Sequence, residues 1–131
     1  MQEFSLDGMR VLIMEDEFLI ALDVEQLCRD HGAADVVIVR NLEELGADPF
    51  ARDPFHVAVL DVMLAGEPTT GFAGQLVERS IPFVFATGYS DNEEMFERFE
   101  GVPVVGKPYS GRDLMAALAG VIGSRRASGG V

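Results

Sequence analysis

The sequence has few of the features that mark membrane, secreted or nucleic-acid-binding proteins. No apolar run approaches the roughly 20 residues that a transmembrane helix needs, and the acidic first seven residues do not resemble a signal peptide. The single cysteine, Cys28, excludes an internal disulfide and suits a reducing compartment. Ten Lys and Arg stand against 22 Asp and Glu, a net charge of −12 that argues against binding to phosphate-rich nucleic acid. We therefore expect a cytoplasmic protein that binds neither membranes nor nucleic acid.

Apolar residues are plentiful, at 48% of 131, which is enough for the buried core of one domain. Five short apolar runs resemble strands buried on both faces of a parallel sheet: residues 9–14, 36–39, 57–60, 81–86 and 102–105. They alternate with helical or loop segments, and this alternation predicts an α/β fold with a doubly wound parallel sheet. We expect an N-terminal extension over residues 1–8, one domain over 9–122 and a flexible tail over 123–131.

Helices and loops are predicted between these strands. Apolar residues at helical spacing between Phe18 and the stop signal Gly32 predict the first helix. Capping by Asn41 predicts a short second helix, and capping by Ser110 predicts the last one. The other expected segments are a loop over 65–71, a short helix over 72–79 and a weak, acidic helix over 91–101.

Polar residues follow four of the five predicted strands. Glu15 and Asp16 follow the first, Asp61 ends the third, Thr87 follows the fourth and Lys107 follows the fifth. Each alone has a plain structural interpretation, since Asp often caps a turn. Parallel strands, however, bring their carboxyl ends to one edge of the sheet, where open α/β sheets bind their ligands. We therefore expect these residues to meet in one site.

Clustered carboxylates raise each other's pKa unless a cation neutralises them. Lys107 is one candidate cation and a divalent ion is the other, with Mg²⁺ the best fit to carboxylate and phosphate oxygens. An Asp nucleophile with Mg²⁺, a Lys and a hydroxyl is suited to phosphoryl transfer onto a carboxylate. Asp61 would attack phosphorus, Glu15 and Asp16 would anchor the ion, and Thr87 would hydrogen-bond the transferred group.

In this order the residues resemble the receiver domains of two-component response regulators, over roughly residues 9–122. The resemblance implies a flavodoxin-like fold with strand order 2-1-3-4-5, and a phosphoacceptor that promotes its own phosphotransfer and dephosphorylation without being an enzyme. It implies that Asp61 takes phosphate from a sensor histidine kinase with Mg²⁺ bound, and that the backbone carbonyl of Met63 is a further ligand. A downstream regulator protein is a possible partner, and the domain would signal by protein contact or act as a phosphate sink.

Two details narrow the resemblance. The run Phe85-Ala86-Thr87-Gly88-Tyr89, with Lys107-Pro108-Tyr109, is similar to the FAT GUY subgroup, whose kinases are often of the HWE type. Val104 stands where receivers usually carry the aromatic that swings inward on activation. We therefore expect activation to order residues 87–101 instead, with Thr87, Gly88, Tyr89 and Tyr109 forming a switch and partner face.

Two other functions stay open at this stage. One is a pseudo-receiver that is never phosphorylated and acts only as an interaction module; the intact Asp61, Thr87 and Lys107 argue against it. The other is a small phosphohydrolase with Asp61 as nucleophile, which would normally carry a second acid beside the nucleophile, and Val62 and Met63 supply none.

Overall fold

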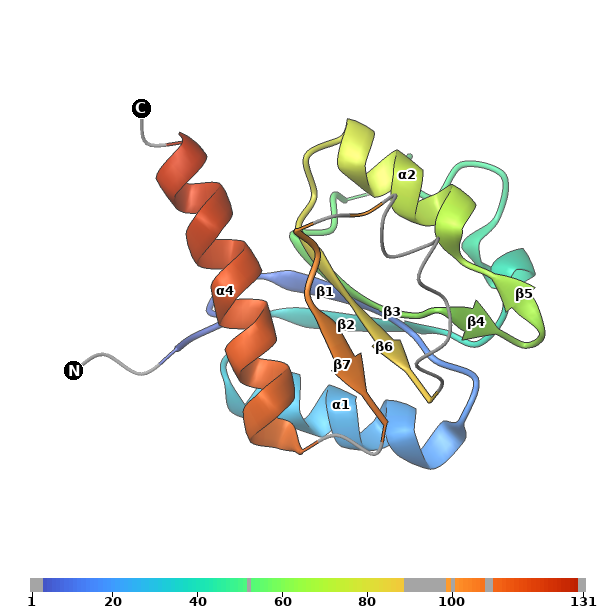
Figure 1. Ribbon diagram of the computed structural model, residues 1–131, viewed down its shortest axis with the longest axis horizontal. Helices are drawn as coiled ribbons and strands as arrows, with labels where there is room; N and C mark the ends of the chain where they lie inside the picture. The colour runs from blue at the N-terminus through green and yellow to red at the C-terminus, as the bar shows by residue number, and fades with distance from the viewer. Residues whose placement is uncertain (1–3, 52, 89–98, 100, 108–109, 130–131) are drawn as a thin grey trace.

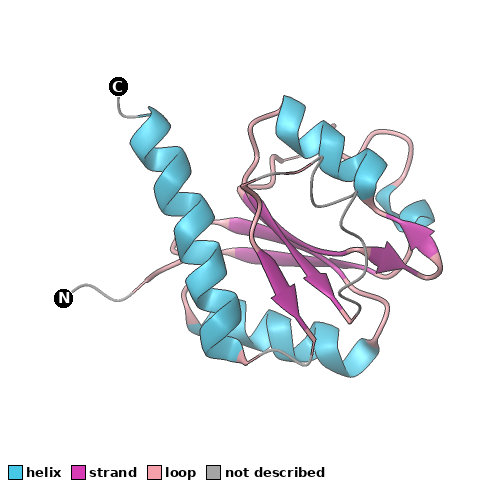
Figure 2. Cartoon of the chain, in the orientation of Figure 1, coloured by secondary structure: helices cyan, strands magenta, loops and turns pink. Residues whose placement is uncertain are grey.

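The computed structural model describes residues 4–51, 53–88, 99, 101–107 and 110–129. Five parallel strands form its sheet, and helices cover both faces (Figures 1 and 2). The strands are β1 (Arg10–Met14), β2 (Asp35–Val39), β3 (Val57–Asp61), β6 (Phe83–Thr87) and β7 (Val104–Gly106). The helices are α1 (Phe18–Asp30), the 3₁₀ helix η1 (Leu42–Leu45), α2 (Thr70–Glu78) and α4 (Gly111–Gly129).

The strand order is β2-β1-β3-β6-β7, with every neighbouring pair parallel. Counted along the chain, this is the predicted flavodoxin-like order 2-1-3-4-5, and the prediction is confirmed. β3 lies at the centre of the sheet, and all five of its residues are buried. All five strands therefore end at one edge of the sheet, which brings the residues after them together.

Two apolar layers lie on opposite faces of the sheet because side chains alternate along each strand. In β1, for example, Val11 and Ile13 join one layer, and Leu12 and Met14 join the other. The first layer also contains buried residues of α1 and α4, and the second contains those of α2. As predicted, the buried positions of α1 share one face: Ala21, Val24 and Cys28.

Two predicted helix caps are confirmed. The Asn41 side chain accepts a hydrogen bond from the backbone N–H of Glu44 at 3.0 Å, and Ser110 Oγ accepts one from the N–H of Asp113 at 3.0 Å. Both are the N-cap contacts that satisfy an otherwise unpaired donor in the first turn.

The segment predicted as a loop over residues 65–71 differs from that expectation. Strands β4 (Met63–Leu64) and β5 (Glu67–Pro68) pair as a short antiparallel hairpin, and α2 begins at Thr70. Ala65 and Gly66 form its turn with φ of 51° and 82°. Positive φ at both central positions suits a two-residue hairpin, because the turn then matches the right-handed twist of the strands. A positive φ is uncommon for alanine. The Gly and Pro content indicated a turn but not the strands on either side.

Ordered structure continues on both sides of residues 9–122, the range expected for the domain. Leu6 is fully buried in the layer that contains α1 and α4, and its backbone N–H donates to the carbonyl of His31 at 2.7 Å. α4 runs through Gly129, past the expected domain boundary at Ile122. Among the described helices, none combines the length and the apolar character that crossing a membrane requires.

Candidate functional site

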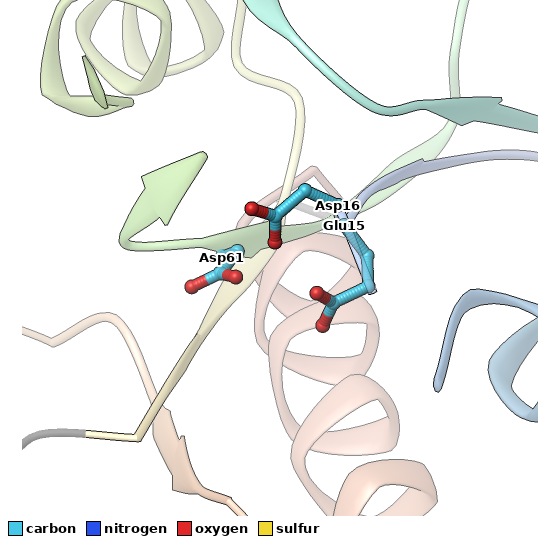
Figure 3. Close-up of side chains that lie close together, drawn as sticks. All are labelled: Glu15, Asp16 and Asp61. Carbon is cyan, nitrogen blue, oxygen red and sulfur yellow. The ribbon is translucent and has the colours of Figure 1, made fainter. Parts of the chain in front are cut away.

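Three carboxylates gather at the carboxyl edge of the sheet (Figure 3). Glu15 and Asp16 follow the last residue of β1, and Asp61 is the last residue of β3. One ligand atom from each lies within 4.8 Å of the others. Glu15 and Asp61 are buried, with exposed fractions of 3% and 8%, while Asp16 is exposed at the rim. The site therefore has a closed side at Glu15 and an open side at Asp16.

Lys107 brings a positive charge to the closed side. Its backbone N–H donates to the carbonyl of Thr87 at 2.7 Å, which fixes the main chain just after β7. Its ammonium lies 2.9 Å from Asp61 Oδ2 and 2.5 Å from Glu15 Oε1. One ammonium thus bridges two carboxylates, one just after β1 and one at the end of β3.

Burial and these ion pairs set the protonation of the site. Burial raises the pKa of Glu15, and hydrogen bonds from Lys107 and from the backbone N–H of Glu17 oppose the rise. Burial alone would lower the pKa of Lys107, but its hydrogen bonds to Glu15 and Asp61 outweigh it and raise that pKa. At neutral pH Lys107 is therefore a fixed positive charge.

Two contacts of the site were not predicted from the sequence. Asp16 Oδ2 accepts a hydrogen bond from the backbone N–H of Ala65 at 3.1 Å, which ties the β4–β5 turn to the acidic cluster. Thr69, fully buried, donates its hydroxyl to the carbonyls of Asp61 at 2.7 Å and Val62 at 3.2 Å. A Thr just before a helix suggests an N-cap, but this hydroxyl makes no cap hydrogen bond. No local sequence signal indicates its contact with the carboxyl end of β3.

Thr87 is the last residue of β6 and is buried, with 7% of its surface exposed. It directly follows Ala86, which is the partner of Asp61 in the sheet. The structure therefore brings Glu15, Asp61, Thr87 and Lys107 to one edge, as the sequence predicts.

The predicted switch face is only partly described. Gly88 follows Thr87 on the surface, and Val104 lies on the edge strand β7 with 41% of its surface exposed. Tyr89 and Tyr109, together with most of the acidic helix expected over 91–101, lie outside the described residues.

The charges of the cluster fit a divalent cation. Three carboxylates and one ammonium leave two negative charges in a space where the carboxylate oxygens approach within 4.8 Å. Oxygen ligands of this kind suit a hard ion such as Mg²⁺, which commonly uses one or two carboxylates and retains waters. The carboxylates of Glu15, Asp16 and Asp61 offer oxygen ligands of this kind.

A five-stranded parallel sheet in this order, with helices on both faces, is the flavodoxin-like fold of signal receiver domains. The chain is similar to the signal receiver domain of a modulated diguanylate cyclase from Desulfovibrio desulfuricans G20. The identity is 26%, over 93% of this chain and 99% of that chain, with a TM-score of 0.74. The match to the receiver domain of a merR DNA-binding response regulator from Colwellia psychrerythraea 34H supports the fold, at 20% identity over 88% and 98% of the two chains, with a TM-score of 0.72.

The chain is also similar to the response regulator PhyR from Brucella abortus. The identity is 25% and the TM-score 0.73, over 95% of this chain but only 51% of PhyR, so the chain spans about half of that protein's length. No model of a known protein family matches the sequence. The comparisons therefore support a receiver domain as the class of protein, and they leave the subgroup open.

Proposed function

We propose that this domain is a response-regulator receiver that accepts a phosphoryl group on Asp61 from a sensor histidine kinase. The observation that carries the proposal is the bridge at the end of the central strand, where Lys107 Nζ lies 2.9 Å from Asp61 Oδ2 beside two further carboxylates. An ammonium held against a carboxylate at this edge can neutralise charge that arrives on that carboxylate.

In the proposed reaction, an Asp61 carboxylate oxygen attacks the phosphorus of a phosphohistidine. A P–O bond forms, the P–N bond breaks, and the imidazole leaves with the bonding electron pair. Lys107 compensates negative charge on the transferring group, and the Thr87 hydroxyl hydrogen-bonds a phosphoryl oxygen once the group is on Asp61. A charge-assisted hydrogen bond of this kind contributes roughly 1.5–3 kcal/mol.

The proposed oxygen ligands for Mg²⁺ are the carboxylates of Glu15, Asp16 and Asp61 and the backbone carbonyl of Met63. When bound, the ion would compensate the two surplus negative charges and the charge of the incoming phosphoryl group. The contact between Asp16 and the N–H of Ala65 supports this assignment, because it orients a ligand carboxylate at the open side of the cluster.

The finer identity of the domain is also a proposal. The run from Phe85 to Tyr89 supports membership of the FAT GUY subgroup, and with it a kinase of the HWE type. The similarity to PhyR supports a second protein partner downstream. The domain, proposed to span residues 9–122, would then change its binding to that partner when phosphorylated, or drain phosphate from a shared kinase.

Activation is proposed to order residues 87–101, because Val104 cannot supply the aromatic side chain of the usual switch. The Thr87 hydroxyl and the Lys107 ammonium would each donate a hydrogen bond to a phosphoryl oxygen, and one or two such bonds shift a two-state equilibrium of the segment about tenfold to a hundredfold. Hydrogen exchange with and without a phosphoryl mimic tests this: protection should rise in residues 88–101. Equal protection in both states would contradict it.

Labelling tests the proposed function directly. The purified protein is mixed with acetyl phosphate and Mg²⁺, or with phosphorylated candidate kinases, and analysed by intact-mass spectrometry. We expect one phosphoryl group on the natural protein and none on Asp61→Asn, while the exposed α1 variant Asp23→Asn labels normally. A natural protein that takes no label from any donor would support the pseudo-receiver instead. Turnover of a phosphomonoester would support the phosphohydrolase.

A further inference from the structure

A cavity of about 350 Å³ opens at the amino edge of the sheet, at the opposite end of the strands from the acidic cluster. It lies between the segments that lead into β3 and β6. Small-molecule sites are commonly apolar cavities of about 300–1,000 Å³ that contain a few placed polar groups. This cavity has both features, since its lining includes apolar Phe50, Phe55, Ile81 and Pro82 and polar His56 and Arg79.

Arg79 brings an unpaired positive charge to the cavity. Its guanidinium carbon lies 4.0 Å from the centroid of the Phe50 ring, and the side chain makes no hydrogen bond or ion pair with another described residue. Arg10 also stacks on a ring of the cavity, but its N–H groups donate to the Asp35 carboxylate and to the carbonyl of Asp53. Arg79 is therefore oriented by stacking while its five N–H donors remain available to a ligand.

The position of Arg79 at the end of α2 does not explain this free charge. A basic side chain there often binds carbonyls that have no helical partner. Here the carbonyls of residues 75–77 accept main-chain N–H groups of residues 79–81, at 2.9–3.1 Å. Acidic residues outnumber basic ones by 22 to 10 in the sequence, yet within the described part of the chain none of them pairs with Arg79.

His56 supplies a second donor and no charge. Its Nδ1 accepts the backbone N–H of Arg10 at 2.8 Å, which assigns the ring proton to Nε2. Nε2 has no partner among the described residues, and the side chain is exposed. One cation and one neutral donor match a singly charged carboxylate, which arginine binds through two parallel hydrogen bonds. A doubly charged phosphate ester would keep one negative charge unpaired, in a chain whose net charge is already −12.

We propose that this cavity binds a small organic monocarboxylate with an aromatic or branched apolar body. The carboxylate binds the Arg79 guanidinium and the Nε2–H of His56, and the body packs against Phe55 and Pro82. This function is separate from phosphoryl transfer, because the cavity lies before the first residue of β3 and Asp61 is the last.

Backbone ¹H–¹⁵N spectra of the metal-free, unphosphorylated protein test the proposal with phenylacetate as the ligand. We expect saturable shifts of amides around the cavity, in residues 55–57 and 79–83, and unchanged amides at the carboxyl edge of the sheet. Phenylacetamide has the same shape without the charge, and acetate has the charge without the apolar body. Each should bind about tenfold more weakly or worse, since one lacks the charge-assisted bonds and the other the buried ring.

Arg79→Gln separates the charge from the cavity. We expect this variant to bind phenylacetate about tenfold more weakly or worse, and to bind phenylacetamide within about threefold of the natural chain. Arg112→Gln is the matched control, because Arg112 is equally exposed but lies in the first turn of α4, and it should bind phenylacetate like the natural chain. Both changes are at exposed side chains, and circular dichroism confirms that each variant is folded.

Three results would overturn the proposal: no saturable shift around the cavity, equal affinity for phenylacetate and phenylacetamide, or equal weakening by Arg79→Gln and Arg112→Gln. Asp61→Asn should bind phenylacetate with natural affinity. A failure of the proposed phosphoryl transfer would therefore leave the carboxylate site standing, and the reverse also holds.

Discussion

Thr69 offers a sharp test of how the acceptor is held, because one buried hydroxyl contacts the main chain of Asp61. Replacing it with valine keeps the shape of the side chain and removes only the donor. The carbonyl of Val62 keeps a hydrogen bond from the Thr69 N–H at 3.0 Å, so the principal loss falls on the carbonyl of Asp61. A buried acceptor left without its donor costs about 1–3 kcal/mol. For a domain of this length, we expect the melting temperature to fall by about 3–12 °C.

The assay is urea unfolding followed by circular dichroism, since the chain has no tryptophan to report by fluorescence. The matched control is Thr70→Val, one residue along, where the side chain is only half-buried. We expect Thr69→Val to lower the midpoint with an unchanged slope, and Thr70→Val to change stability by about 0.5 kcal/mol or less. Labelling at Asp61 should also slow in Thr69→Val, because the hydroxyl positions the acceptor's own peptide group.

Equal stability of the two variants would refute this reasoning. It would mean that a water molecule or a small backbone shift supplies a new hydrogen-bond donor to the Asp61 carbonyl. The Thr69 hydroxyl would then not be needed to position Asp61.

Three further predictions concern the core, the acidic cluster and the buried thiol. Leu6→Ala should cost about 2–5 kcal/mol, while Leu19→Ala, the same change at a side chain 75% exposed, should be nearly neutral; a neutral Leu6→Ala would show that the segment before β1 is not part of the core. Because burial raises the pKa of Glu15, the native state binds a proton more tightly than the unfolded state. This tighter proton binding by Glu15 contributes fully to the free energy of unfolding below about pH 4.5, and the contribution is lost as the pH rises through the higher native pKa of Glu15. In metal-free unfolding experiments at increasing pH, Glu15→Gln should therefore gain stability relative to the natural chain; a constant difference would contradict this. Burial raises the pKa of Cys28 to about 11, so at pH 8 a thiol reagent should react only as the protein unfolds, and rapid labelling of the native protein would refute it.

Much of the fold could be predicted from the sequence because its strands are buried on both faces. Such strands are continuous apolar runs, as in Val57–Leu60, and their alternation with helices restricts the topology. The caps at Asn41 and Ser110 were predictable for a similar reason, since each contact joins residues three apart in the chain.

The contacts that escaped prediction join residues that are distant in the chain or depend on side-chain reach. The burial of Leu6 against the layer containing α1 has no periodic pattern to reveal it. The Thr69 hydroxyl bonds to carbonyls seven and eight residues earlier, across the β4–β5 hairpin. The topology alone predicts that Lys107 lies at the same sheet edge as the acids. The distances in the folded chain are needed to show that Lys107 bridges Glu15 and Asp61, and that Asp16 instead accepts a hydrogen bond from the Ala65 N–H.

The parallel sheet also determines where other polypeptide can be attached. β1 begins, and α4 ends, on the side of the molecule away from the β4–β5 hairpin and the acidic cluster (Figure 1). An affinity tag, a fluorescent protein or another domain joined at either end would therefore lie on the side opposite the acidic cluster. It would not block access of a partner protein or a phosphoryl donor to that cluster. Fusions at both ends can thus be used to measure partner binding by energy transfer without obstructing the surface where phosphate is proposed to arrive.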